Sequence, residues 1–191
     1  MDKQKSLSDT ALVELATKNP ESFGILMERY QGPLFHYIRR IAQLSKEDTE
    51  DLLQEVFIKI YQKLNEYNDE LKFSSWAYRI AHNHVIDYFR KTSARPRTNS
   101  LEDSEWEKLI HSSVHVEKDI ADGDCAKKIK ICIGNLPVHY REVLILRFIE
   151  EKEYEEIMDI LKKPKGTVAT LIKRGKEMLV KRLEEENINC F

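Results

Sequence analysis

The sequence has no segment typical of a membrane-spanning or exported protein. Among its 191 residues, no apolar run approaches the roughly 20 residues that cross a bilayer. Residues 1–16 contain no apolar core like that of a signal peptide. We therefore expect a protein that works in the cytoplasm.

Cysteine is scarce and its positions are uninformative. The three cysteines, Cys125, Cys132 and Cys190, are odd in number, widely spaced and without a Cys-x-x-Cys pair. This spacing predicts neither a disulfide framework nor a zinc site. Cys132 stands between two isoleucines, a setting that favours a small core residue over a redox role.

Strand patterns are also missing. No segment alternates apolar and polar residues between turn signals, and no internal repeat is evident. The sequence therefore predicts an all-α fold.

Glycine and proline cluster at a few breaks and divide the chain. Residues 33–91 hold one proline, at their start, and no glycine. A polar, helix-poor cluster at 92–100 follows, and an acidic stretch comes after it. We predict two small helical domains, residues 1–92 and 124–191, joined by a flexible linker at 93–123.

The formal net charge of −2 conceals a segregated distribution. From Lys162 to Arg182 there are eight lysines or arginines and one acid, Glu177, whereas Leu101 to Asp124 holds eight acids and two lysines. A basic block of this kind provides an electrostatic footprint for DNA, with an affinity that falls steeply as salt rises.

A predicted helix beginning near Lys46 carries a wide apolar stripe on one side and a polar patch on the other. Asp51, Gln54 and Glu55 lie at i, i+3 and i+4, so their side chains group together. Periodicity alone leaves two interpretations open, a solvated face and a binding patch.

The next predicted helix, Ser74 to Lys91, mixes aromatic rings, amides and cations. Single-stranded DNA requires such a mixture, because bases stack on rings while phosphates meet cations. Aromatic residues at helical spacing are also expected in an ordinary core, so this pattern alone decides nothing.

Two motifs in these helices resemble those of a known family. Asp51–Phe57, followed by Trp76–Asn83, is similar to the core-binding and promoter-melting signature of extracytoplasmic-function (ECF) sigma factors. The C-terminal part resembles the helix-turn-helix domain of that family in four short segments: Leu136-Pro137, Arg141–Leu144, Tyr154–Ile157 and Gly166–Val168. The resemblance covers about residues 8–92 and 124–184.

The resemblance implies a sigma factor, not an enzyme, that lends promoter recognition to RNA polymerase and needs no cofactor or small-molecule substrate. Its first domain would be sigma domain 2, in which Asp51, Gln54 and Glu55 dock on the clamp-helix coiled coil of the largest polymerase subunit. Carboxylates and an amide on a rigid helix can pair with arginines there.

The same domain would bind the minus-ten element, where a base leaves the stack and enters a pocket. We expect Asn83 to read a base, because its amide both donates and accepts. The remaining candidates share aromatic or cationic character: Phe73, Trp76, Tyr78, Arg79, Arg90 and Lys91. The three aromatic residues could equally belong to the core.

The second domain would be sigma domain 4. Ile157, Met158 and Leu161 precede a short break, and a second apolar set follows, as in a helix-turn-helix. The second helix would then meet the minus-thirty-five element through Lys165, Thr167, Thr170, Lys173 and Arg174. Arg174 could read a guanine and Lys165 a phosphate.

Several positions depart from the family pattern. Lys162 replaces the usual turn glycine, and a residue with a Cβ costs about 1 kcal/mol in a left-handed conformation. Pro164 replaces a capping serine, a substitution that a first helical turn tolerates. His82 replaces an arginine and Met158 a small residue, while Ala169 and Leu171 stand where cations are common. Because of these changes, the resemblance does not predict which promoter sequence the protein recognises.

Two alternatives to a sigma factor remain open, a zinc hydrolase and a stand-alone helix-turn-helix regulator. A zinc hydrolase could use His82, His84 and Asp87, but His82 and His84 are two apart on a helix and point in different directions. The other candidate pair, His111 and His115, lies in the predicted linker with no nearby third ligand. A stand-alone helix-turn-helix regulator would explain only the C-terminal part. The resemblance also implies an anti-sigma factor, often membrane-anchored.

Overall fold

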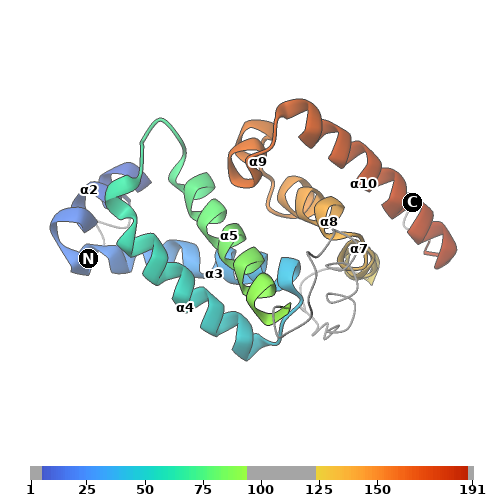
Figure 1. Ribbon diagram of the computed structural model, residues 1–191, viewed down its shortest axis with the longest axis horizontal. Coiled ribbons are helices and arrows are strands. Elements are labelled where there is room, and N and C mark those ends of the chain that lie inside the picture. Colours follow the sequence, from blue (N-terminus) through green and yellow to red (C-terminus); the bar gives the residue numbers. More distant parts are fainter. Residues whose placement is uncertain (1–5, 94–123, 189–191) are drawn as a thin grey trace.

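The computed structural model describes residues 6–93 and 124–188 (Figure 1). The linker predicted at 93–123 therefore lies outside the described residues except for Ser93, and so does the pair His111 and His115. Within the described ranges all regular elements are helical, which confirms the predicted all-α class. None of these helices is both long enough and apolar enough to cross a membrane.

Among residues 6–93 there are four α-helices and two short 3-10 turns. They are α2 (Asp9–Lys18), η1 (Pro20–Ser22), α3 (Phe23–Ala42), α4 (Lys46–Gln62), η2 (Leu64–Glu66) and α5 (Phe73–Ser93). Serine caps begin two of the helices: Ser8 accepts a hydrogen bond from the Ala11 amide at 3.3 Å, and Ser45 accepts from the Asp48 amide at 3.1 Å. Left-handed Gln43 ends α3.

The core of this part lies between α3, α4 and α5, which pack on one another. Leu34, Ile38, Val56 and Ala77 are completely buried there. At the N-terminal end of α5, rings from three segments pack edge to face or tilted; they belong to Tyr30, Tyr67, Phe73 and Trp76.

The C-terminal part is a second helical unit. Its elements are α7 (Asp124–Gly134), α8 (Val138–Leu144), a π-helical turn η3 (Ile145–Ile149), α9 (Tyr154–Leu161) and α10 (Lys165–Glu185). Gly175 brings α10 close to α8, because a Cβ there would lie 3.2 Å from the Leu144 side chain. Cys132 is buried with a free thiol, as predicted. Cys125 is disulfide-bonded, which the cysteine spacing did not predict.

The two parts pack directly against each other. Helix α5 lies alongside α9, and α3 also contacts α8 and η3 (Figure 1). Arg141 of α8 donates to the Ile41 carbonyl at the C-terminal end of α3, over 3.2 Å, where the helix dipole favours a cation. Gln43 donates to the Gly134 carbonyl at 2.7 Å. The described residues thus share one continuous apolar core.

Candidate nucleic-acid interface

The polar patch on α4 is exposed as a unit. Asp51, Gln54 and Glu55 are all solvent-accessible, while Leu52 and Val56 on the opposite side are buried. The helix is fixed by its packing on α3 and α5. The patch is therefore a preorganised set of acceptors on a rigid support.

Glu55 of this patch is held by a residue from α5. The imidazole N–H at His84 Nε2 donates to Glu55 Oε2 over 2.8 Å. The other ring nitrogen, Nδ1, is buried without a hydrogen-bond partner, and burial lowers the pKa of His84. His84 is therefore favoured as the neutral tautomer with its proton on Nε2, and it orients the Glu55 carboxylate.

The α5 residues predicted to bind DNA through polar or charged side chains divide into two groups. Asn83, Arg90 and Lys91 are exposed, in the C-terminal half of the helix. Arg79 lies in the N-terminal half, and its Nη1 pairs with Asp159 Oδ1 of α9 at 2.6 Å. The structure thus presents only part of the predicted minus-ten surface to solvent.

The three aromatic candidates are buried, with exposed fractions of 2% for Phe73, 5% for Trp76 and 3% for Tyr78. Phe73 and Trp76 pack with Tyr67 at centroid distances of 5.4 and 5.5 Å. In this arrangement they are core residues, which was the alternative that the sequence left open.

Tyr78 lies at the contact with the C-terminal part. Its hydroxyl donates to Glu150 Oε2 at 2.6 Å, and Lys152 Nζ lies 4.4 Å from its ring centroid. Burial and the nearby Glu150 carboxylate raise the pKa of Tyr78. The hydroxyl is therefore protonated and serves as a hydrogen-bond donor.

A buried titratable pair lies deeper in the same contact. His82 Nε2 is 3.6 Å from Glu142 Oε2, and His82 Nδ1 is 3.2 Å from the Tyr37 hydroxyl. Desolvation raises the pKa of Glu142 to about 7 and lowers that of His82 to about 4. His82 and His84 contact different partners, as their spacing predicted. Within the described ranges no cluster of three or more metal-ligating side chains occurs.

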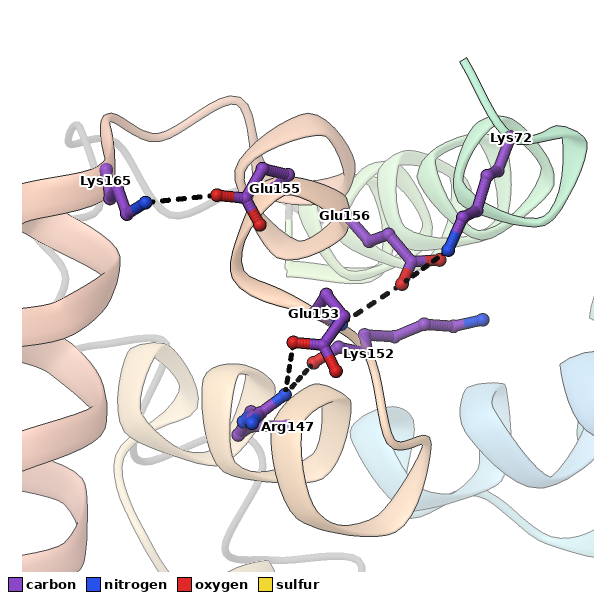
Figure 2. Close-up of polar contacts among 7 residues, drawn as sticks. All are labelled: Lys72, Arg147, Lys152, Glu153, Glu155, Glu156 and Lys165. Atoms are coloured by element: carbon purple, nitrogen blue, oxygen red, sulfur yellow. Dashed lines mark hydrogen bonds and ion pairs between the residues drawn. The ribbon is translucent and has the colours of Figure 1, made fainter.

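Helices α9 and α10 form the predicted helix-turn-helix. Val168, Ile172 and Gly175 of α10 face the core, whereas all five predicted contact residues are exposed: Lys165, Thr167, Thr170, Lys173 and Arg174. Two of the five have partners within the chain: Lys165 pairs with Glu155 at 3.1 Å (Figure 2), and the Thr170 hydroxyl donates to the Gly166 carbonyl at 2.8 Å.

The turn between these helices contains the strain that the sequence predicted. Lys162 has φ 51° and ψ 43°, the left-handed conformation that glycine adopts without cost. Pro164 immediately precedes α10 with φ −63°, a value that its ring favours. The departures from the family pattern are therefore accommodated without loss of the motif.

The sequence did not single out the acids that face α5. Glu156 of α9 pairs with Lys72 at 3.4 Å (Figure 2), and it accepts a hydrogen bond from the Ser75 hydroxyl at 3.3 Å. Glu150 pairs with Arg40 at 2.7 Å. The dense acids between Glu150 and Asp159, directly before the basic block, are the signal that could have drawn attention to this surface.

Comparison with known proteins agrees with this architecture. The family described as Sigma-70 region 2 matches residues 26–95, and that described as Sigma-70, region 4 matches residues 127–179. The ECF RNA polymerase sigma-E factor of Haemophilus influenzae is 30% identical over 186 residues, covering 94% of this chain and 97% of that protein. The sigma factor SigW of Bacillus subtilis is 30% identical over 174 residues, covering 86% and 90%.

Solved structures show the same fold. CnrH, in complex with the cytosolic domain of CnrY, has a TM-score of 0.66 at 21% identity, over 93% of this chain and 97% of that one. RpoE of Bartonella quintana, in complex with the anti-sigma factor NepR, has a TM-score of 0.68 at 17% identity, over 86% and 98%.

Two sigma-type helical units, the second a helix-turn-helix, define a promoter-recognition protein. With the relatives above, the chain belongs to the ECF RNA polymerase sigma factors. It is accordingly a factor for promoter-specific transcription initiation, and the stand-alone regulator is not favoured.

Proposed function

We propose that this chain binds RNA polymerase core through the α4 patch, defined as Asp51, Gln54 and Glu55. The observation that carries the proposal is the exposure of all three side chains on one rigid helix, with Glu55 oriented by His84. Such acceptors suit the cationic clamp coiled coil of the largest subunit, and a preformed geometry loses little entropy on binding.

Promoter recognition is proposed for two other surfaces, one on α5 and one at the start of α10. Residues 1–92 act as sigma domain 2, in which Asn83, Arg90 and Lys91 offer amide and cationic groups to the minus-ten strand. Residues 124–191 act as sigma domain 4, in which the exposed start of α10 enters the major groove at the minus-thirty-five element. The protein acts in the cytoplasm as a factor for polymerase and catalyses no reaction of its own.

We also propose an anti-sigma partner. RpoE of Bartonella quintana was solved with an anti-sigma factor, and its fold covers most of this chain. The exposed DNA-binding surfaces here are the regions that such a partner would cover.

Core binding tests the first proposal. Labelled protein is titrated with polymerase core, and Asp51→Arg and Glu55→Arg are compared with Glu14→Arg, which reverses an exposed acid on α2. Both patch reversals should weaken binding at least tenfold, while Glu14→Arg binds like the unaltered protein. Equal affinity for all four proteins would contradict the role of the patch.

His84→Leu refines the same measurement. It removes the N–H that orients Glu55 but leaves the patch charge unchanged. Because Glu55 is largely exposed, the bond contributes less than about 1 kcal/mol, so affinity should fall by about two- to fivefold. In the Glu55→Gln background the substitution should have a smaller effect.

A further inference from the structure

The C-terminal part contains a covalent bond for which promoter recognition has no use. Cys125, the second residue of α7, is disulfide-bonded, whereas Cys132 of the same helix keeps a free thiol. The chain has three cysteines, so Cys190 is the one partner left for a bond within the chain. Cys190 lies outside the described residues, which end two positions earlier at Ile188.

The end of α10 lies beside α7. The two helices pack on each other, and the Cys132 thiol donates to Glu186 Oε2, just past the end of α10, over 3.5 Å. Cys125 and Cys132 are seven residues apart, which is two turns of helix, so they share one face of α7. Cys125 therefore stands about 10 Å from Cys132 along the face that meets the end of α10.

A capped turn fixes where the chain leaves α10. Asn187 is left-handed, with φ 51°, and its amide donates to the Glu184 carbonyl at 3.1 Å. The Ile188 amide donates to the Leu183 carbonyl at 2.9 Å. These are the two hydrogen bonds of a Schellman motif, which ends a helix at a defined position. Two further residues extend at most about 7 Å, so Cys190 is confined to the surroundings of this end of α10.

We propose that Cys125 and Cys190 are a redox modification site, a reversible disulfide that follows the thiol–disulfide balance around the protein. Disulfides of cytoplasmic proteins are in most cases transient and redox-sensing, because the thiol pool there is kept reduced. The reversible character therefore rests on the proposed action of this protein in the cytoplasm, whereas the bond itself does not.

The two described cysteines differ as such a switch requires. Cys125 is partly exposed in the first turn of α7, where the helix dipole stabilises negative charge. The thiolate is the form that attacks a disulfide. Cys132 is completely buried, and burial together with the Glu186 carboxylate raises the pKa of its thiol. Cys132 thus stays protonated and shielded while Cys125 reacts.

A low-molecular-weight disulfide such as oxidised glutathione is a sufficient oxidant. The Cys125 thiolate attacks it, forms a mixed disulfide and releases one small thiolate. The Cys190 thiolate then attacks the Cys125 sulfur, which closes the protein bond and releases the second small thiolate. Two protein thiols are oxidised, one small disulfide is reduced to two thiols, and the two protons end on the released thiols.

The bond closes a covalent loop around the whole C-terminal part. Residues 125–190 span α7, α8, α9 and α10, so the bond joins the point where the chain enters this part to the point where it leaves. Such a cross-link lowers the entropy of the unfolded chain, and the effect grows with the length of the loop. The oxidised protein therefore keeps its helix-turn-helix to a higher temperature, while the exposed residues at the start of α10 are unchanged.

Thiol counting and peptide mapping identify the bond. The full-length protein is equilibrated with oxidised or with reduced glutathione, its free thiols are alkylated in denaturant, and its proteolytic fragments are weighed by mass spectrometry. The oxidised protein should keep one alkylated cysteine, Cys132, and yield a fragment pair linked through Cys125 and Cys190. Reduced glutathione, added to the native protein, should expose all three thiols.

Thermal unfolding measures the consequence. The oxidised form should unfold at least about 5 °C above the reduced form. Cys125→Ser and Cys190→Ser should each abolish this difference. The matched control is Cys132→Ala, which removes a buried thiol but keeps both partners of the bond. Its overall stability falls, and the difference between its oxidised and reduced forms should remain.

Several results would overturn the inference. These are a bond that includes Cys132, linked fragments that come from covalent dimers, a native bond that reduced glutathione does not open, no bond after oxidation, or equal unfolding temperatures of the two forms. None of these readouts uses polymerase or DNA. Failure of this chain to bind polymerase core would therefore count against the proposed function and leave the disulfide standing.

Discussion

At the residue scale, several charged side chains of this protein lie where water is largely excluded. Glu142 and His82 are both less than 9% exposed, and Arg141 is 1% exposed. Desolvation favours the neutral form of each side chain. It raises the pKa of Glu142 to about 7 and lowers that of His82 to about 4 and that of Arg141 to about 10. The contact that they occupy is consequently sensitive to pH.

Glu142→Gln should reduce this pH dependence. The folded-state pKa of Glu142 is raised from 4.5 to about 7, so its contribution to stability is complete below pH 4.5 and is lost as pH rises through 7. The loss amounts to about 3 kcal/mol. Urea unfolding of both proteins at pH 5 and pH 8 checks this: the variant should gain relative to the unaltered protein at pH 8.

His82 acts in the opposite direction, because its lowered pKa costs stability as pH falls from 6.5 toward 4. His82 lies 3.6 Å from Glu142, so the two contributions are coupled at pH 5; at pH 8 His82 is neutral in the folded and unfolded states of both proteins, and a gain of the variant there reports on Glu142. An unchanged difference between the two proteins at pH 5 and pH 8 would show that Glu142 does not titrate in this range.

Lys162→Gly should stabilise the helix-turn-helix. Lys162 has a left-handed backbone that costs a residue with a Cβ about 1 kcal/mol, and glycine removes that cost. Lys162 also pairs with Asp159, but its side chain is 63% exposed, so the loss of that pair is small. Thermal and urea unfolding should show a gain of about 0.5–1 kcal/mol.

Glu177→Gly is the control, because the same glycine in the exposed interior of α10 should lower stability by about 1 kcal/mol. If Lys162→Gly lowered stability as much as Glu177→Gly, the strain at the turn would be absent.

At the element scale, local signals determine where helices begin and end. The Ser45 cap begins α4, and its hydroxyl accepts from the Asp48 amide. Acids in the first turn of α4 add to the effect through the helix dipole. The position of the α4 patch therefore depends on a cap that lies well outside it.

Ser45→Ala should lower the free energy of unfolding by about 1 kcal/mol, since one amide of the first turn loses its acceptor. Ser45→Asp keeps an acceptor and should recover most of the loss. Chemical unfolding measures both. Equal stability of the alanine and aspartate variants would contradict the capping role.

The sequence predicted these elements well because their signals are local. The helices that begin near Lys46 and Ser74 appear as α4 and α5, and the break at 162–166 separates α9 from α10. The contact between α5 and α9 was not predicted, because Arg79 and Asp159 are 80 residues apart and no period or cap connects them. For the same reason the burial of Tyr78 was left open.

At the scale of the whole molecule, the two described parts pack on each other, and the C-terminal part contacts Tyr78 and Arg79, two of the seven predicted minus-ten residues. The α4 patch and the start of α10 stay exposed. Since a sigma factor recognises promoters together with polymerase core, the protein alone should bind promoter DNA weakly.

Run-off transcription tests the central claim most directly. Purified polymerase core is assayed on a library of promoter fragments with and without this protein, and with Asp51→Arg and Glu55→Arg. The account predicts specific transcripts that require the unaltered protein and disappear with both reversals while these variants remain folded. A core that gains no initiation on any fragment, while the protein alone shifts duplex DNA specifically, would contradict the account and favour a stand-alone regulator.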